Sequence, residues 1–353
     1  MKKLLILFLL IPFLVRAYST SATSAILMDL DSGRIIYANN KDLVRSVASI
    51  SKIMTAVVAI ESDKLDEIVT VGSEIKSAYG SGIYIREGEE LTLRDLLYGL
   101  MLRSGNDAAL SIATYVGGDV QTFVSMMNDK AKSIGMKNST FNNPSGLDQE
   151  KGNYSSAYDM ALLMKYAYQL KEFREIVSTK KYELKTNMNY YLWNNKNKLL
   201  YMYKYANGGK TGFTEKARRT LVTTASKNNT NLVAVTLNDG NDFLDHKALF
   251  EEAFGEYNSY QILNKDKVNI VGETFYKNAY FYLKKDFTYL LKKKEIDDIL
   301  IKYNLDKIDN VQSDTKVGGV KVYFKDKVIY TGDVFIKLKK EKKSFWKVFD
   351  RLW

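Results

Sequence analysis

Ser49 and Lys52 are the residues of this chain whose types and spacing best suit chemistry, because they form an S-x-x-K tetrapeptide at the head of an apolar run. On a helix, side chains three residues apart share a face, with Cβ atoms ~5–6 Å apart. A serine hydroxyl is a weak nucleophile that needs an adjacent base. A lysine amine can be that base where burial or a neighbouring cation lowers its pKa, and residues 53–60 are apolar enough to bury it. The pair therefore predicts nucleophilic catalysis at Ser49.

The more familiar pairing of serine with histidine has little support in this sequence. His246 is the single histidine, and no serine motif lies near it. We therefore interpret His246 as a surface or helix-capping residue rather than a catalytic base. One histidine argues against a zinc site, and the absence of cysteine excludes disulfides and thiol catalysis. No metal or other cofactor is expected.

Two further short motifs follow Ser49 in order. Ser104-Gly105-Asn106 is an S-x-N triplet at a break between two predicted helices, where the hydroxyl can relay a proton to a leaving amine and the amide can hold a substrate carbonyl. Lys210-Thr211-Gly212 is a K-T-G triplet at a predicted strand start. Its lysine and hydroxyl can bind a carboxylate, and its glycine lets a substrate backbone approach closely.

Each motif is weak alone, and their order is what makes them informative. S-x-x-K also occurs at Ser73, Ser178, Ser313 and Ser344, and S-x-N recurs at Ser226. The match at Ser49 opens a long apolar helix and precedes the other two motifs. From Ser49 to Ser104 there are 55 residues, and from Ser104 to Lys210 there are 106. This ordered set is typical of penicillin-binding proteins and class A β-lactamases.

Around these motifs the chain resembles the D-alanyl-D-alanine carboxypeptidase family, the low-molecular-weight penicillin-binding proteins. The resemblance covers residues 24–254 and is carried by segments 49–56, 97–109, 143–148, 154–161 and 209–214. It implies an α/β (α+β) catalytic domain, penicillin-binding or β-lactamase-like, in which helices flank an antiparallel sheet. A small all-β domain and a C-terminal amphipathic helix would follow it.

The resemblance also implies the course of a reaction. Ser49 would attack the carbonyl between the two terminal D-alanines of a peptidoglycan stem peptide, and Lys52 would take its proton. Ser104 would pass a proton to the departing D-alanine, and water would then release the shortened peptide. β-Lactam antibiotics would mimic the substrate and acylate Ser49 covalently.

The substrate-binding candidates are Asn106, Lys210, Thr211, Gly212 and Phe213. In the family's pattern, Lys210 and Thr211 would hold the terminal carboxylate. The N–H groups of Ser49 and Phe213 would form the oxyanion hole. The partners implied are stem peptides ending in D-Ala-D-Ala and, as inhibitors, β-lactams.

One departure and two alternatives stay open. Arg218-Arg219 stand after the third motif where many family members have glycine or a small residue, so the far end of the substrate could be held differently. A class A-like β-lactamase would need a carboxylate that activates the deacylating water. Glu150 lies between the second and third motifs, but residues 148–153 do not match the β-lactamase loop. A non-catalytic wall-binding or β-lactam-sensing module is the other alternative, and the three intact motifs argue against it.

Apolar periodicity predicts the elements that position these motifs. We expect a hairpin at 24–39, helices at 49–60, 92–102, 107–115 and 158–170, and strands at 221–225 and 232–237. Beyond a composition shift near 257–264, we expect strands at 268–271, 279–283, 317–324 and 328–338. The expected domains are a catalytic domain at 18–258 and a small β-sandwich at 262–338.

Residues 1–17 are typical of a secretory signal peptide. Lys2 and Lys3 precede an apolar run of twelve residues, which is short of the ~20 needed to cross a bilayer. Cleavage is expected after Ala17 or, as a second choice, after Ala22. The protein would then be exported to the extracytoplasmic face of a bacterial membrane.

The net charge is +11, and its distribution suggests the kind of partner. Residues 262–353 carry 21 Lys/Arg and 13 Asp/Glu, an excess of +8, so the catalytic region without the signal peptide is nearly neutral. Enzymes of nucleic acids are more often basic at the active site, so no nucleic acid is expected. Residues 339–353 would form a basic amphipathic helix that lies peripherally on an anionic membrane surface.

Overall fold

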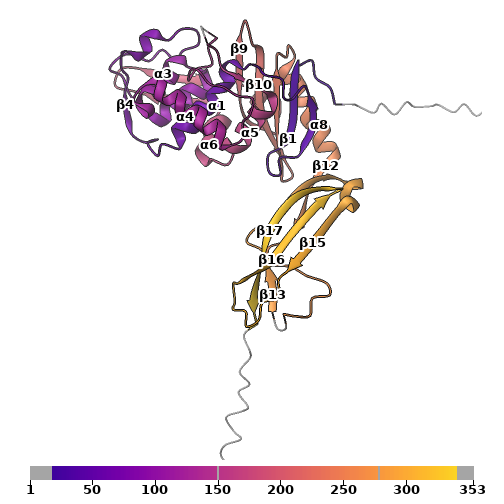
Figure 1. The fold of residues 1–353 in the computed structure, drawn as a ribbon. Helices are drawn as coiled ribbons and strands as arrows, with labels where there is room; N and C mark the ends of the chain where they lie inside the picture. Colours follow the sequence, from indigo (N-terminus) through magenta and orange to yellow (C-terminus); the bar gives the residue numbers. More distant parts are fainter. Residues whose placement is uncertain (1–17, 149–150, 277–278, 340–353) are drawn as a thin grey trace, which may run out of the picture. The chain divides into compact units, whose positions relative to one another are not determined.

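The computed structural model describes residues 18–148, 151–276 and 279–339. The chain divides into two compact units, one ending at Gly255 and one beginning at Glu256 (Figure 1). The boundary expected between residues 258 and 262 falls inside strand β12 (Tyr257–Leu263), which pairs within the second unit. The expected signal peptide, residues 340–353 of the expected C-terminal helix, and Glu150 lie outside the described residues.

A five-stranded antiparallel sheet runs through the first unit in the order β2-β1-β11-β10-β9. Its strands are β1 (Ser24–Asp29), β2 (Ile35–Asn39), β9 (Ala206–Thr214), β10 (Arg218–Lys227) and β11 (Thr230–Leu237). The expected hairpin and the two strands expected between 221 and 237 are confirmed. β9, which carries Lys210-Thr211-Gly212, is an edge strand, so one side of its backbone is open for pairing with a ligand.

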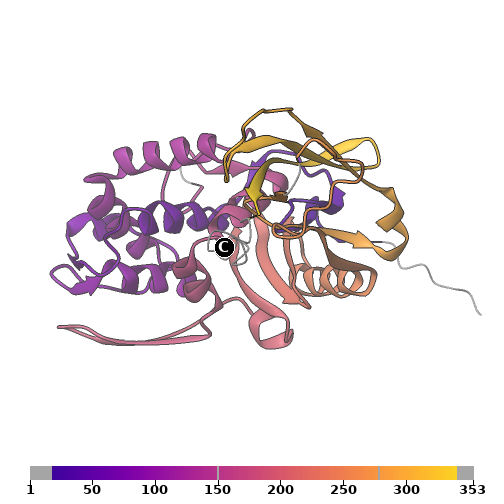
Figure 2. The same ribbon diagram turned by 90° about the horizontal axis from the view of Figure 1, so that it is seen from below.

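Helices cover both faces of this sheet (Figures 1 and 2). They are α1 (Lys52–Ile60), α2 (Leu93–Tyr98), α3 (Asn106–Gly117), α4 (Val120–Ser133), α5 (Ala157–Ala167), α6 (Lys171–Ser178), α7 (Leu199–Met202) and α8 (Asp242–Glu256), with a 3-10 turn η2 (Ser73–Ser77). α1 is buried along its whole length, because all its side chains except Lys52 and Thr55 are apolar. α5 packs against β1 and β11 on one face. α8 lies on the opposite face, where His246 contacts Thr223 of β10 and Thr236 of β11.

Two expected helices differ in detail from the prediction. Ser49 lies in a 3-10 turn, η1 (Ala48–Ser51), and the regular helix α1 starts at Lys52. The helix expected at 92–102 is regular only as α2 and continues as a wider π-type turn, η3 (Gly99–Arg103). Ser104, the next residue, has a left-handed backbone with φ 65°. This conformation ends the turn and separates it from α3.

Three short antiparallel ladders tie down the loops. They are β3 (Arg45–Ser46) with β6 (Tyr154–Ser155), β4 (Ile68–Thr70) with β5 (Glu90–Thr92), and β7 (Lys181–Lys185) with β8 (Tyr190–Asn194). The β7–β8 hairpin is the pink arm that runs along the helical side of the unit in Figure 2. Tyr182 anchors it, because its ring stacks on Tyr98 at 3.8 Å and its hydroxyl donates to Asp95 at 2.5 Å.

The second unit contains two antiparallel sheets that share one core. The smaller pairs β12 with β14 (Phe287–Lys292), and the larger has the order β13-β17-β16-β15. These strands are β13 (Ala279–Tyr282), β15 (Ile299–Leu305), β16 (Lys316–Phe324) and β17 (Lys327–Leu338), with a 3-10 turn η4 (Lys293–Asp298). Val317, Val320, Val322, Val334 and Ile336 lie at the centre of the core.

One strand expected in this unit, at 268–271, is wrong. Val268 makes a single bridge to Phe281, and the chain then turns at Gly272, whose φ is 82°. Residues 268–271 are too few before the turn at Gly272 to form a paired strand. Within the described ranges, no helix is both long and apolar enough to cross a bilayer.

Candidate active site

Ser49 and Lys52 lie side by side at the start of α1. The Nζ atom of Lys52 donates a hydrogen bond to Ser49 Oγ at 3.2 Å, a distance at which a base can activate a nucleophile. Ala48, immediately before Ser49, has a left-handed φ of 51°. That conformation is costly for a residue other than glycine, and such strain concentrates at active sites. The candidate nucleophile therefore follows a strained turn rather than a regular helix.

Two further acceptors fix the Lys52 amine. It donates to Asn106 Oδ1 at 2.6 Å and to the Ser145 carbonyl oxygen at 2.5 Å. Asn106 in turn donates through Nδ2 to the Tyr79 carbonyl oxygen at 2.6 Å. With Ser49 Oγ, the amine has three partners, and the Lys52 side chain is fully buried. The side-chain amide of Asn106 thus joins the lysine to the loop that contains Tyr79.

The surroundings of Lys52 favour its neutral form. Burial lowers its pKa well below that of a free lysine, the charges of Lys210 and Lys196 lower it further, and Asp107 opposes them. Burial also lowers the pKa of Lys210 to about 7, with Lys196 adding to the effect. Desolvation and like charges both disfavour an ammonium ion. A neutral Lys52 amine keeps its two N–H groups for Asn106 and Ser145 and turns its lone pair to Ser49 Oγ, so it can accept the serine proton.

A cavity of about 410 Å³ opens on Ser49. Five of the eight predicted site residues line it, namely Ser49, Ser104, Thr211, Gly212 and Phe213. Lys52, Asn106 and Lys210 do not line it and are buried. The cavity wall also contains Ser81, Lys196, Lys198, Arg219, Asp242 and Phe243. The cavity therefore brings the three motifs together with Arg219, which the sequence marked as a departure from the family, and with two lysines that no motif contains.

Ser104 lies at the junction of η3 and α3, where its left-handed backbone interrupts the helical run. Asp107, just beyond the motif, fixes this junction to the neighbouring loop. Its carboxylate accepts the backbone N–H of Ile83 at 3.0 Å and that of Tyr84 at 2.6 Å. The turn that carries the S-x-N motif is thus tied to the loop that also contacts Asn106.

The Lys210 side chain lies behind the cavity wall. Its side chain is 1% exposed, and its Nζ donates to the carbonyl oxygen of the next residue at 2.8 Å. The cations in the cavity wall are Lys196, Lys198 and Arg219. Lys210 instead lies close enough to Lys52 for its charge to lower the pKa of that amine.

Arg219 is held at the cavity wall by the first residues of α8. Its Nε donates to Asp242 Oδ2 at 3.2 Å, and its Nη2 donates to the other carboxylate oxygen. The guanidinium carbon lies 5.5 Å from the centre of the Phe243 ring, a cation–π distance. Arg218 differs, because it pairs with Glu215 at 3.0 Å on the surface and does not line the cavity.

Segment 143–148 carried part of the family resemblance without an assigned role, and it supplies an acceptor for Lys52. Asn143 shapes this turn, because its Oδ1 accepts from Ser145 N at 3.1 Å and from Gly146 N at 2.6 Å. An asparagine that caps the backbone two residues on is a recognisable turn signal. That signal predicts the turn, whereas the contact of the Ser145 carbonyl with Lys52 depends on tertiary structure.

Two glycines allow the supporting segments to approach Ser49. A Cβ atom on Gly146, whose φ is 82°, would lie 2.1 Å from the Ala48 carbonyl oxygen. A Cβ atom on Gly212 would lie 2.4 Å from Thr220 Oγ1 and 3.0 Å from the Ser49 nitrogen. Strand β9 therefore runs beside the Ser49 N–H. Gly212 thus permits a close approach between strand β9 and the turn that contains Ser49.

The interpretation of His246 as a surface or capping residue is wrong. Its ring is fully buried, with Nδ1 2.6 Å from Thr223 Oγ1 and Nε2 3.1 Å from Thr236 Oγ1. Two hydroxyl partners satisfy both ring nitrogens, which is how a polar ring is accommodated in a core. Burial lowers its pKa to about 3. In the part of the chain that the structure describes, no group of three or more His, Asp or Glu residues could hold a metal ion.

Comparison with known proteins agrees with this arrangement. Residues 12–241 match the family described as D-alanyl-D-alanine carboxypeptidase. D-alanyl-D-alanine carboxypeptidase DacF of Bacillus subtilis is 36% identical over 220 residues, which cover 61% of this chain and 56% of that protein. D-alanyl-D-alanine carboxypeptidase DacD of Escherichia coli is 33% identical over 345 residues, which cover 90% of this chain and 87% of that protein. The chain therefore matches little more than half of DacF but most of DacD.

Solved structures show the same fold. Penicillin binding protein 5 from Haemophilus influenzae has a TM-score of 0.77 at 26% identity, covering 92% of this chain and 99% of that chain. Penicillin binding protein 6B from Escherichia coli has a TM-score of 0.71 at 30% identity, covering 91% of this chain and 97% of that one. The expected fold class, a penicillin-binding catalytic domain followed by a small β domain, is confirmed. The chain belongs to the D-alanyl-D-alanine carboxypeptidase family.

Proposed function

We propose that the chain is a serine-type D-alanyl-D-alanine carboxypeptidase that removes the terminal D-alanine of peptidoglycan pentapeptides through an acyl-enzyme on Ser49. The observation that carries the proposal is the 3.2 Å hydrogen bond from Lys52 Nζ to Ser49 Oγ beside a cavity. Burial lowers the pKa of this lysine, so its amine can act as a base. Membership of the family supplies the substrate class, peptides ending in D-Ala-D-Ala, and the inhibitor class, β-lactams.

In the acylation step, Ser49 Oγ attacks the carbonyl carbon between the two D-alanines while its proton passes to Lys52. The N–H groups of Ser49 and Phe213 stabilise the negative charge on the carbonyl oxygen. The C–N bond then breaks, and Ser104 relays a proton to the departing amine. Water then attacks the resulting ester and gives a proton to Lys52. Lys52 passes this proton to Ser49 Oγ as the bond to the shortened peptide breaks.

The terminal carboxylate of the substrate is held by Thr211 and Arg219 in this proposal. Both residues line the cavity that opens on Ser49. Asp242 fixes the guanidinium of Arg219 before substrate binds, and hydrogen bonds to charged groups are roughly twice as strong as neutral ones. Lys210, which is buried, contributes its positive charge behind Thr211 rather than a direct contact.

The deciding experiment follows D-alanine release from a pentapeptide together with labelling by fluorescent penicillin. Ser49→Ala is expected to abolish both while its circular dichroism stays that of the wild type. Labelling of a folded Ser49→Ala protein would contradict the assignment. For the wild type, rapid hydrolysis of penicillin without peptide cleavage would identify a β-lactamase instead. Absence of both activities would identify a non-catalytic module.

We further propose that the protein is exported and lies peripherally on the extracytoplasmic face of the membrane. Residues 1–17 have the composition of a signal peptide, and residues 339–353 place Phe and Trp among Lys and Arg. Amphipathic helices of this kind bind anionic lipid at the interface. Deleting residues 344–353 is expected to move the protein from the membrane fraction to the soluble one. Full-length protein that does not bind anionic vesicles would contradict this.

A further inference from the structure

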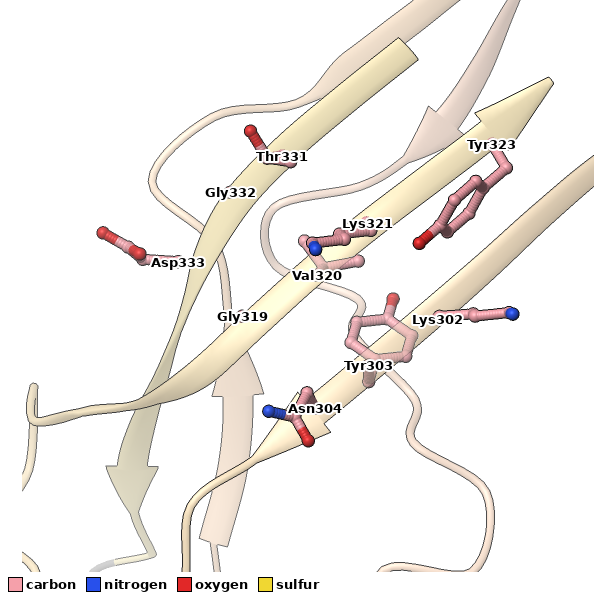
Figure 3. A pocket seen from close by; sticks show the side chains of 10 residues that line it. All are labelled: Lys302, Tyr303, Asn304, Gly319, Val320, Lys321, Tyr323, Thr331, Gly332 and Asp333. Carbon is pink, nitrogen blue, oxygen red and sulfur yellow. The ribbon is translucent and has the colours of Figure 1, made fainter. Parts of the chain in front are cut away.

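The larger sheet of the second unit carries a cavity that the proposed reaction does not use. The cavity, about 630 Å³, lies over β15, β16 and β17 (Figure 3). We propose that it binds an anionic sugar chain, that is, a glycan bearing carboxylate or phosphate groups. This binding does not depend on chemistry at Ser49, so the two proposals can fail separately.

Two lysines of neighbouring strands line this cavity, with their amines pointing to opposite sides of it (Figure 3). Lys302 of β15 and Lys321 of β16 are direct register partners, and both line the cavity. Like charges directly opposite one another destabilise an antiparallel pair. Among the described residues, neither lysine forms an ion pair; the nearby carboxylate of Asp333 pairs with Lys316 at 2.7 Å. A chain with several anionic groups could contact both amines from opposite sides of the cavity, so the pair favours a polyanionic ligand.

The hollow itself comes from a missing side chain. Gly319 is the register partner of Asn304 on one side and of Asp333 on the other, so the middle of that row is open (Figure 3). A Cβ atom on Gly319 would find its nearest neighbour, the Gly332 carbonyl oxygen, at 3.5 Å, an ordinary contact. The sheet could therefore accept a side chain at Gly319, and the glycine leaves room for a ligand.

The groups around the hollow suit a sugar rather than a bare anion. Asn304 and Thr331 line it and offer an amide and a hydroxyl, which can donate to and accept from sugar hydroxyls. Tyr323 points its hydroxyl into the hollow (Figure 3), while Lys302 Nζ lies over its ring, 5.3 Å from the centre. A phenolic hydroxyl can donate to and accept from a sugar hydroxyl. The volume is within the range of small-molecule sites, ~300–1,000 Å³.

The charge of the unit agrees with an anionic polymer. Residues 256–339 contain 16 Lys and 12 Asp/Glu, a net charge of +4. A positive unit raises the local concentration of a polyanion around it. The two lysines and the glycine hollow would then determine where along the unit the polymer binds.

The test measures binding of the full-length protein to polygalacturonate, a carboxylated sugar polymer, beside poly-glutamate, neutral dextran and anionic vesicles. We expect polygalacturonate to bind more tightly than the other two polymers. Replacing both lysines, Lys302→Ala with Lys321→Ala, should weaken this binding by about tenfold or more, because hydrogen bonds to charged groups are lost. Gly319→Leu fills the hollow without changing charge and should weaken it similarly. Gly319→Ala is a milder replacement if the leucine variant does not fold.

The control removes the same charge elsewhere on the same sheet. Lys325→Ala with Lys327→Ala, at the turn between β16 and β17, should change polygalacturonate binding less than about twofold. All variants should release D-alanine from a soluble pentapeptide at the wild-type rate. Equal binding of poly-glutamate would overturn the sugar assignment, and equal losses in the control pair would overturn the site. Vesicle binding that is lost in Gly319→Leu would identify a lipid surface instead.

Discussion

The helices on the two faces of the catalytic sheet each bury one base, and the two bases have different neighbours. α1 carries Lys52 and α8 carries His246; both side chains are fully buried, and burial lowers the pKa of both. The histidine nitrogens contact the hydroxyls of Thr223 and Thr236 inside the core. The lysine amine contacts Ser49 Oγ beside a cavity. Both side chains therefore have a lowered pKa. Of the two, only Lys52 also contacts a nucleophile beside a cavity, and this contact marks the active site.

The two bases also differ in what lowers their pKa. For His246 the cause is burial alone. For Lys52, burial is followed by the charges of Lys210 and Lys196. The cations of the site thus form a coupled group, whereas the histidine is isolated. Substitutions near Lys52 should change its protonation, and substitutions near His246 should leave catalysis alone.

The largest effect is expected from Lys52→Arg. A guanidinium keeps the positive charge but stays protonated in proteins, so it cannot take the proton of Ser49. Loss of general-base catalysis typically lowers a rate by about 10²–10⁴-fold. Stopped-flow acylation by a chromogenic β-lactam would measure it. A near-normal rate in this variant would exclude Lys52 as the base.

A smaller effect is expected from Arg219→Ala. Losing a hydrogen bond to a charged group costs about 1.5–3 kcal/mol, so kcat/KM for a D-Ala-D-Ala peptide should fall by about 10–100-fold. A peptide with an amidated C-terminus should lose much less. Arg218→Ala is the matched control, since that side chain pairs with Glu215 on the surface. Equal losses on both peptides, or an equal loss in Arg218→Ala, would show that Arg219 does not hold the carboxylate.

A shift in pH dependence is expected from Lys210→Met. Acylation requires neutral Lys52, so the rate should rise as pH rises through the Lys52 pKa. Removing the charge of Lys210 removes one of the causes that lower this pKa, so the acid limb should move to higher pH. Lys198→Met is a suitable control, because Lys198 lines the cavity but is not among the charges that act on Lys52. An acid limb that stays in place would mean that the two lysines are not coupled.

The regular elements were predictable from sequence where apolar periodicity is strong. The hairpin at 24–39 and the buried helix after Ser49 are such cases. α4 was missed although its signal was present: Asp119 caps its first turn, and residues 120, 123, 124 and 127 form an apolar stripe. The β7–β8 hairpin was also missed, although residues 181–185 alternate polar and apolar and asparagines mark the turn at 186–189. Only its packing had no sequence signal, because Tyr182 stacks on Tyr98, 84 residues earlier in the chain.

The site was predictable as a set of motifs but not as a set of contacts. Five predicted residues meet at one cavity, because the fold brings two motifs at helix ends beside a third on edge strand β9. The third motif lies in the middle of β9 rather than at the expected strand start. The Ser145 carbonyl that accepts from Lys52 has no side-chain signature in the sequence. The pairing of Arg219 with Asp242 joins β10 to α8 and depends on where that helix packs. The burial of His246 likewise depends on Thr223 and Thr236, which lie on strands β10 and β11.

The smallest effect on catalysis is expected from His246→Gln. The glutamine amide can donate to one threonine and accept from the other, as a neutral imidazole does, and His246 does not line the cavity at Ser49. The acylation rate at pH 7 should therefore stay within about twofold of the wild type, since a residue without contact with reacting atoms contributes no transition-state interaction. A loss comparable to that of Lys52→Arg would mean that the histidine takes part after all.

The same substitution should change how folding stability responds to acid. Burial lowers the pKa of His246 to about 3 in the folded protein, against ~6.5 in an unfolded chain, so between these values the unfolded state binds the extra proton. Wild-type stability is then fully retained above pH ~6.5 and falls as pH decreases towards 3, by up to about 1.4 kcal/mol per pH unit from this residue. A glutamine at this position cannot bind this proton. The free energy of unfolding of His246→Gln should therefore rise relative to that of the wild type as the pH falls from 6.5 to 4.5. Urea unfolding at several pH values measures this difference. A difference between the two proteins that does not vary with pH would show that the ring is not held neutral by burial.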